Sequence, residues 1–250
     1  MPRSVLTDPS PTLREVTDLL EYRLDGPVAV LTFDDGKANA YTHEALDAIG
    51  AGLDRASDEA TAVLLVGRPG RFSAGFDLSV MTSGLEPMRA LVAAGARLML
   101  RLFTFPMPVV AACTGHALAA GALVLLSCDR RIGAEGDYKL GLNEVAIGMG
   151  LPHFAVELAR YRMPSSAFDS VVLGRTFDPA GAVGAGFLDR AVAADEVVAA
   201  ATAEAHDLAA LSTGAVAHTK RLARQTLADE ILGGLEADMA GTGGPSTGAV

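Results

Sequence analysis

Residues 109–132 read VVAACTGHALAAGALVLLSCDRRI, and this stretch decides the fold. A strand over 108–112 is followed by a turn that contains glycine, and then by an apolar helical segment over 119–128. Because this helix has no polar face, it is expected to be buried on every side. We therefore expect a strand, a turn and a helix at the centre of one domain.

The flanking segments continue this alternation of strands and helices. On the N-terminal side, strands are predicted over 28–33 and 62–70, with a helix over 42–56 between them and Thr42 as its N-cap. A long helix over 86–103 precedes the central strand. The later segments are two short strands and five helices, over 131–134, 138–140, 154–161, 165–173, 178–185, 195–211 and 213–225. The pattern indicates an α/β protein with a mostly helical C-terminal part.

Composition limits the kinds of protein that this sequence can be. Half of the 250 residues are hydrophobic, which is sufficient for a sizeable core. The net charge is −10 and no basic cluster is present, so nucleic-acid binding is not expected. The longest apolar run, 117–126, is too short to span a bilayer, so we expect no membrane association.

The N-terminal residues and the cysteines favour a cytoplasmic location. Residues 1–15 contain several prolines and no apolar segment, so a disordered leader is expected rather than a signal peptide. Cys113 and Cys128 are the two cysteines, and both lie in apolar stretches. This pattern is typical of buried, reduced thiols rather than of a disulfide framework.

Three segments depart from simple core building. RFSAGFDL at 71–78 and GHALAAG at 115–121 are rich in small residues, and Gly75 allows a close approach of its backbone to another group. Glu144 is a lone carboxylate within LGLNEVAIGMGL at 140–151. Each segment alone has an ordinary explanation, because small residues often serve packing and a lone glutamate often caps a helix or pairs with an arginine.

Together, the three segments indicate chemistry at a carbonyl group. A helix N-terminus offers unpaired N–H groups and the positive end of the helix dipole. If an N–H group from a second loop faces it, the two donors form a hole that stabilises a developing oxyanion. Glu144 above such a hole could move a proton on the carbon next to the carbonyl.

FSAGFDL, VVAACTGHALAAGALVLLSCDRRI and YKLGLNEVAIGMGLP resemble, in order and spacing, three sequence blocks of the crotonase, or enoyl-CoA hydratase/isomerase, superfamily. The resemblance extends approximately over 28–220. It implies a spiral of ββα units, a C-terminal helical segment used for trimerisation, and a homotrimer or dimer of trimers. The expected division of the chain is a disordered leader over 1–15, the spiral core over 16–190, the helical segment over 191–235 and a disordered tail over 236–250.

The resemblance assigns the reactive groups residue by residue. It places the first oxyanion-hole amide at Phe76 and the second at Ala120, where the family usually has glycine. Glu144 takes the position of the acid/base glutamate. The family's hydratases carry a further glutamate three residues after the second donor, and here that residue is Leu123.

The single carboxylate favours one reaction over another. Hydration of a 2-enoyl thioester needs an activated water and a proton donor, and two carboxylates commonly share this work. One carboxylate is sufficient to move a proton between C2 and C4. With Leu123 keeping that wall dry, Glu144 indicates a Δ3,Δ2-enoyl-CoA isomerase. Its apolar surroundings are expected to raise the pKa of Glu144 towards the operating pH.

The resemblance also implies contacts to an acyl-CoA thioester. Lys37 matches a loop beside the CoA and Arg71 precedes the first donor, although both could be ordinary surface charges. Asp77 is expected to orient its loop, and 80–84 to shape the acyl pocket. The complete set of expected contacts is Lys37, Ala38, Ala40, Arg71, Ala74, Gly75, Asp77, Leu78, Gly121, Leu123 and Lys220, the last towards a neighbouring subunit's ligand.

Two alternatives remain at this point. One is a hydratase that works with Glu144 alone, and the other is a non-catalytic CoA-binding protein, favoured by Ala119 and Ala120 in place of glycines. The histidines show no metal-ligand spacing, so no metal is expected, and no cofactor beyond the CoA part of the substrate. His116 is expected to be a packed, hydrogen-bonded loop residue.

Overall fold

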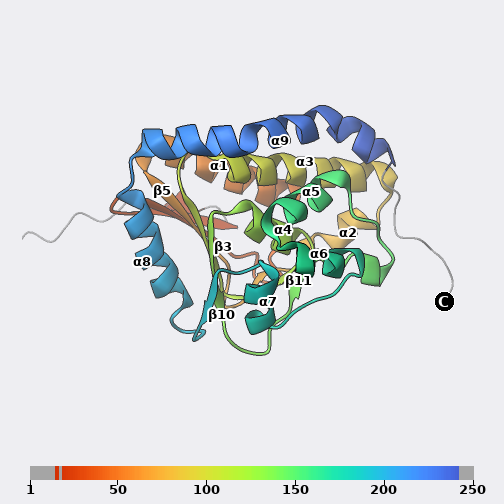
Figure 1. Cartoon of the computed structure of the whole chain (residues 1–250), viewed down its shortest axis with the longest axis horizontal. Coiled ribbons are helices and arrows are strands. Elements are labelled where there is room, and N and C mark those ends of the chain that lie inside the picture. The colour runs from red at the N-terminus through yellow and green to blue at the C-terminus, as the bar shows by residue number, and fades with distance from the viewer. Residues whose placement is uncertain (1–14, 17–18, 242–250) are drawn as a thin grey trace, which may run out of the picture.

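The computed structural model describes residues 15–16 and 19–241, which form one layered α/β structure (Figure 1). The main sheet has the strand order β1-β2-β3-β5-β8-β10-β12. Neighbouring strands from β3 to β12 run parallel, whereas β1 and β2 pair antiparallel. Its strands are Glu15–Val16, Leu20–Asp25, Val28–Phe33, Ala62–Val66, Val109–Cys113, Arg130–Ala134 and Arg190–Val192.

Two small sheets lie apart from the main one. One has the order β11-β9-β6, and the other pairs β4 with β7. The strands are β4 (Ala40–Tyr41), β6 (Gly70–Ser73), β7 (Gly75–Phe76), β9 (Gly115–Leu118) and β11 (Leu140–Gly141). After β3, β5, β8 and β10, the chain adds short strands of these sheets and then returns through a helix. This repetition is the predicted spiral of ββα units.

Both faces of the main sheet are buried, which explains why its central strands are almost entirely apolar. Side chains alternate across a strand, so Ala29 and Leu31 enter one core while Val28 and Val30 enter the other. The larger core lies under α1 (His43–Glu59), α3 (Leu85–Thr104) and α9 (Thr213–Gly241). The smaller core lies under α8 (Val197–Ala209), on the left in Figure 1.

Helix α4 (Ala120–Ser127) occupies the centre of the larger core, and all of its residues are buried as predicted. It packs against α3 and α5 (His153–Arg162). The remaining short helices are α2 (Leu78–Met81), α6 (Ser165–Val172) and α7 (Pro179–Ala185). Both cysteines are free and buried. Thr42 caps α1, because its side chain accepts a hydrogen bond from Ala45 N at 3.1 Å.

The C-terminal part differs from the prediction. Helix α9 continues to Gly241, so the helix predicted over 213–225 ends too early and the tail predicted over 236–250 begins too early. Ala228, Ile231, Leu235 and Met239 recur at helical spacing and are buried, and in Figure 1 this part of α9 runs along α3. Residues 1–14 and 242–250, predicted to be disordered, lie outside the described residues.

The predicted boundary at 190/191 falls inside strand β12, which pairs with β10 in the main sheet. The segment 191–235 therefore supplies a strand and a covering helix, α8, to the same fold. Among the helices in the described ranges, none combines the length and apolar character needed to cross a membrane.

Candidate active site

Strand β7 presents the Phe76 amide away from its partner strand. Gly75 and Phe76 pair in parallel with Ala40 and Tyr41 of β4, and Asp77 N donates to Tyr41 O at 3.0 Å. Because successive amides of an extended strand point to opposite sides, the Phe76 N–H is directed away from β4. Ser73 fixes the approach to this strand, since its hydroxyl donates to Asn39 O at 2.6 Å and accepts from Gly75 N at 3.1 Å.

The N-terminus of α4 lies directly against this strand. A Cβ atom placed on Gly75 would be 3.4 Å from Ala120 N and 2.9 Å from the Ala119 Cβ. Gly75 has a φ of +103°, which also favours glycine. Among the described residues, the Ala120 N–H donates no hydrogen bond outside its own helix, and no side chain caps α4. The amides of Phe76 and Ala120 therefore lie close together.

The next residues of α4 serve packing. A Cβ atom on Gly121 would lie 2.6 Å from Ser73 O, so glycine here lets the helix approach β6. Leu123 is 2% exposed and belongs to the larger core. Neither residue is on the cavity wall described below, so their predicted contact with a ligand is not seen.

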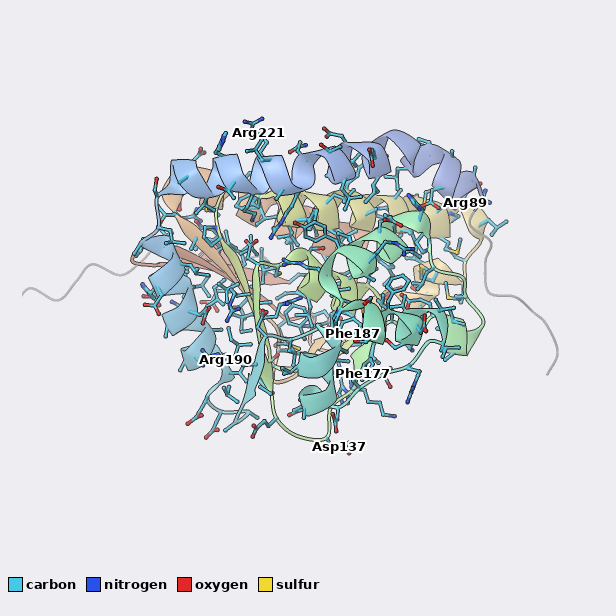
Figure 2. The ribbon with its side chains drawn as sticks, viewed as in Figure 1. Arg89, Asp137, Phe177, Phe187, Arg190 and Arg221 are labelled. Carbon is cyan, nitrogen blue, oxygen red and sulfur yellow. The ribbon has the colours of Figure 1, made fainter. Side chains whose placement is uncertain are left out.

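Glu144 follows β11 at the start of a short 3-10 turn, Val145–Ile147. The strand is anchored by Phe177, which exchanges backbone hydrogen bonds with Leu140 at 2.8 and 2.9 Å. Phe177 in turn packs against buried Phe187, with ring centroids 6.1 Å apart, and Figure 2 shows both beside α7. The backbone carbonyl of Glu144 accepts from Met149 N at 2.9 Å. The main chain that carries the carboxylate is therefore firmly held.

The Glu144 side chain neither caps a helix nor pairs with an arginine in the described part of the chain, the two ordinary roles of a lone glutamate. Its Oε2 atom is buried and has no hydrogen-bond partner in this part of the chain. Removal from water penalises the charged form and raises the pKa of Glu144 to about 7. The carboxyl group can therefore both accept and release a proton near neutral pH.

A cavity of about 360 Å³ joins these segments. Six predicted site residues line it, Ala38, Ala40, Ala74, Phe76, Asp77 and Leu78, and Glu144 lies on the wall with them. Further lining residues that the sequence did not single out as contacts are Ser79, Leu118, Ala119, Asn143, Ile147 and Met149. Met81, from the segment expected to shape the acyl pocket, is also on the wall. Most of these side chains are apolar, which suits an acyl chain.

Asp77 has the predicted structural role. Its carboxylate caps α2 by accepting from Ser79 N at 2.9 Å and Val80 N at 3.1 Å. The hydrogen bond from the Ser79 hydroxyl is the main reason that the pKa of Asp77 lies below its usual value. His116 likewise lies in a packed position, where its Nδ1 accepts from Lys139 N at 3.0 Å.

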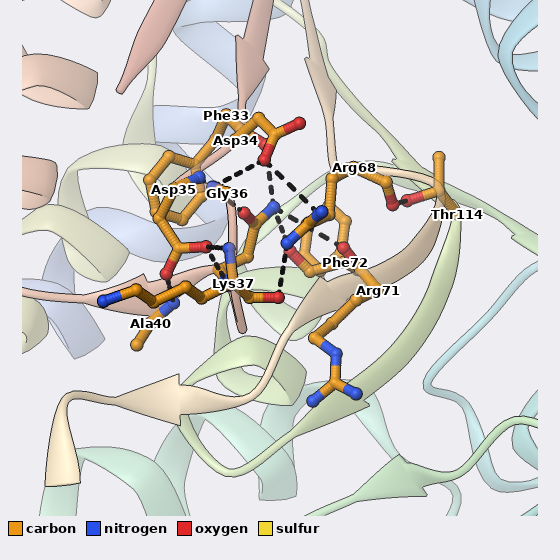
Figure 3. Close-up of polar contacts among 11 residues, drawn as sticks. Phe33, Asp34, Asp35, Gly36, Lys37, Ala40, Arg68, Arg71, Phe72 and Thr114 are labelled. Atoms are coloured by element: carbon orange, nitrogen blue, oxygen red, sulfur yellow. Dashed lines mark hydrogen bonds and ion pairs between the residues drawn. The ribbon is translucent and has the colours of Figure 1, made fainter. Parts of the chain in front are cut away.

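The loop that carries Lys37 is built by polar contacts (Figure 3). Asp35 accepts hydrogen bonds from the backbone amides of Lys37, Asn39 and Ala40 at 2.7 to 2.9 Å. Within the described ranges, neither the Lys37 ammonium nor the Arg71 guanidinium has an ion pair or hydrogen bond, and both point away from the contacts drawn in Figure 3. Both remain candidates for binding an anion beside the cavity.

Lys220 differs from its predicted position. It is 7% exposed, and its ammonium donates to Asp129 at 2.7 Å and to Met107 O at 3.1 Å. Arg224 also pairs with Asp129 at 2.7 Å. Because a buried ammonium with these partners has little freedom to leave them, Lys220 is not positioned to reach towards a ligand, contrary to the expectation from the sequence. Its contacts join α9 to the end of α4.

Comparison with known proteins gives consistent matches. The model of the enoyl-CoA hydratase/isomerase family matches residues 23–241. A probable enoyl-CoA hydratase of Bacillus subtilis is 36% identical over 157 residues, which is 60% of each chain. Human mitochondrial enoyl-CoA delta isomerase 1 is 30% identical over 88% of this chain and 75% of its own. A solved structure of an enoyl-CoA hydratase/isomerase family protein from Pseudomonas syringae superposes with a TM-score of 0.87 and 44% identity, over 90% of this chain and 98% of that one.

Proposed function

The chain belongs to the enoyl-CoA hydratase/isomerase family, and we propose that it moves the double bond of a 3-enoyl-CoA to the 2-position. The amides of Phe76 and Ala120 hold the thioester oxygen, while Glu144 transfers the proton. The observation that carries this proposal is the buried, unpartnered Oε2 of Glu144 on the wall of a cavity that also reaches Phe76 and Ala119.

The reaction proceeds in two proton transfers. The Glu144 carboxylate takes a proton from C2, and the electron pair of that C–H bond moves into the thioester carbonyl, which becomes a dienolate. Two fixed amide donors stabilise the negative oxygen more strongly than water does, because they need no reorganisation. The protonated Glu144 then returns its proton at C4, and the double bond is left between C2 and C3. A pKa of about 7 suits both transfers.

The carboxylates at the cavity favour isomerisation over hydration. Of the residues that line it, Asp77 and Glu144 carry carboxylates, and that of Asp77 is occupied in capping α2. Position 123 holds a buried leucine, so it supplies no second acid for activating water. The human relative named as a delta isomerase supports the same choice, whereas the Bacillus subtilis relative named as a hydratase supports the alternative.

Lys37 and Arg71 supply positive charge for the phosphates of CoA in this proposal. Their location fits, because Lys37 directly precedes the cavity residue Ala38 and Arg71 lies in the strand that leads to Ala74. We also propose that the protein is cytoplasmic and that it forms a homotrimer or a dimer of trimers. Sedimentation of the purified protein would test the oligomeric state.

The decisive experiment compares two substrates. Purified protein is assayed for conversion of trans-3-hexenoyl-CoA to 2-hexenoyl-CoA, and separately for hydration of crotonyl-CoA. We expect the first reaction to be faster and to fall at least about a hundredfold in Glu144→Gln, which keeps the shape of the side chain but cannot exchange the proton. Faster hydration than isomerisation, or full isomerase activity in the variant, would contradict the proposal. Tight binding of both substrates without turnover would indicate a non-catalytic CoA-binding protein.

A further inference from the structure

Ala119 has a backbone conformation that alanine rarely adopts. Its φ is 51° and its ψ is −124°, and the other positive-φ positions in the described part of the chain are glycines and Asn39. An L side chain is strained in this conformation, and such strain persists only where the surrounding structure imposes it. Asn39 has an evident reason, because asparagine tolerates the left-handed region and its amide donates to Phe33 O at 2.7 Å. Ala119 has only a methyl group to offer.

The position of this methyl group suggests its use. Ala119 lines the cavity together with Glu144 and immediately precedes the Ala120 amide. Its Cβ would be 2.9 Å from a Cβ placed on Gly75, so the methyl occupies the space beside the strand that carries the Phe76 amide. It therefore lies next to both amide donors and on the same cavity wall as the acid.

We propose that Ala119 determines specificity by excluding acyl-CoA thioesters that carry a substituent on C2. The inference rests on the proposed function, in which the thioester oxygen lies between the two amides. C2 is then two bonds from that oxygen and faces Glu144, so a branch on C2 competes with the Ala119 methyl for the same space. Glycine at 119 would remove both the methyl group and the backbone strain. If position 119 served only as a turn, glycine would therefore be the more stable residue there. The preferred substrates are therefore straight at C2.

The test measures binding and needs no turnover. Dissociation constants of butanoyl-CoA and 2-methylbutanoyl-CoA are measured by calorimetry for the native protein and Ala119→Gly. We expect the native protein to bind the straight ligand about 10- to 200-fold more tightly, as is typical for one methyl group in a close-fitting pocket. In Ala119→Gly this ratio should fall at least fivefold, mainly through tighter binding of the branched ligand.

Two further variants isolate the effect of the methyl group. Ala119→Ser keeps a Cβ atom and should keep the native ratio. Ala199→Gly removes a methyl from the exposed surface of α8, outside the cavity wall, and should also keep it. Equal affinities for both ligands in the native protein would overturn the proposal, and this comparison needs no variant. An unchanged affinity ratio in folded Ala119→Gly would also overturn it. Isomerase activity with no C2 discrimination refutes this inference alone, whereas C2 discrimination without isomerase activity refutes only the proposed reaction.

Discussion

Glu144→Gln should stabilise the protein at alkaline pH and leave its stability unchanged in acid. The pKa of Glu144 is about 7 in the folded protein, because burial disfavours the charged form. An unfolded glutamate has a pKa of about 4.3, and each unit of difference corresponds to about 1.4 kcal/mol. Ionisation of Glu144 therefore costs the folded state about 4 kcal/mol at most.

The direction of the pH dependence follows from the raised pKa. Below about pH 4 the carboxyl is protonated in both states, so there is no cost. Between about pH 4 and 7 only the unfolded state loses the proton, and the free energy of unfolding falls as the pH rises. Above about pH 7 the cost is complete. Glutamine has no proton to lose, so the variant avoids this cost.

Thermal unfolding followed by circular dichroism from about pH 4 to pH 9 measures the difference between the native protein and Glu144→Gln. At about 2–4 °C per kcal/mol for a chain of this size, the midpoint of the variant should exceed that of the native protein by about 8–16 °C at pH 8. Glu230→Gln makes the same substitution on the exposed surface of α9, and its effect is subtracted. A difference between the two midpoints that stays constant across this pH range would refute a buried carboxylate at 144.

Three other substitutions test the packing and the ligand contacts. Gly121→Ala places a Cβ 2.6 Å from Ser73 O and should lower the free energy of unfolding by about 1–3 kcal/mol in a urea titration; an unchanged value would contradict the close contact. Lys220→Met should lower the free energy of unfolding by about 2 kcal/mol, because it removes the charged hydrogen bond to Asp129. It should leave the dissociation constant of acyl-CoA unchanged, and a tenfold weaker affinity would indicate that Lys220 does contact the ligand. Arg71→Ala should weaken acyl-CoA binding up to about fivefold, with a smaller effect at high salt. It should not affect binding of butanoyl-pantetheine, which lacks the phosphates. An equal loss of affinity for both ligands would show that Arg71 does not act at the phosphates.

The sequence predicts the long elements because their own residues carry the signal. The central strands β3, β5 and β8 are almost continuous apolar runs, and α4 is apolar on all sides, so neither depends on knowledge of a partner. Strands β1, β2 and β12 carry charged residues and lack this signal, and the sequence did not predict them. Strands β6 and β9 were not predicted, and β11 was predicted over 138–140, slightly before its observed position. These segments have two to four residues with mainly small or polar side chains, and they form strands only because they pair with segments far away in the sequence. The sequence therefore determines the layers more clearly than the small sheets that hold the site.

The candidate site depends on a resemblance that joins distant segments, whereas features set by local conformation and packing are not visible in the sequence. Phe76, Ala120 and Glu144 come from separate segments, and the fold brings their neighbourhoods to one cavity. Nothing in the sequence shows that Ala119 has a positive φ, because alanine normally avoids it. Lys220 resembles a surface cation in the sequence, and its burial follows from the packing of α9 against Asp129.

A crystal structure of Glu144→Gln with bound 3-hexenoyl-CoA tests most directly where the thioester oxygen binds. The thioester oxygen should lie within about 3 Å of both the Phe76 and Ala120 amide nitrogens, with the side chain at 144 over C2 and C4. An oxygen bound to other donors, or a residue 144 separated from C2 by more than one water molecule, would contradict the account.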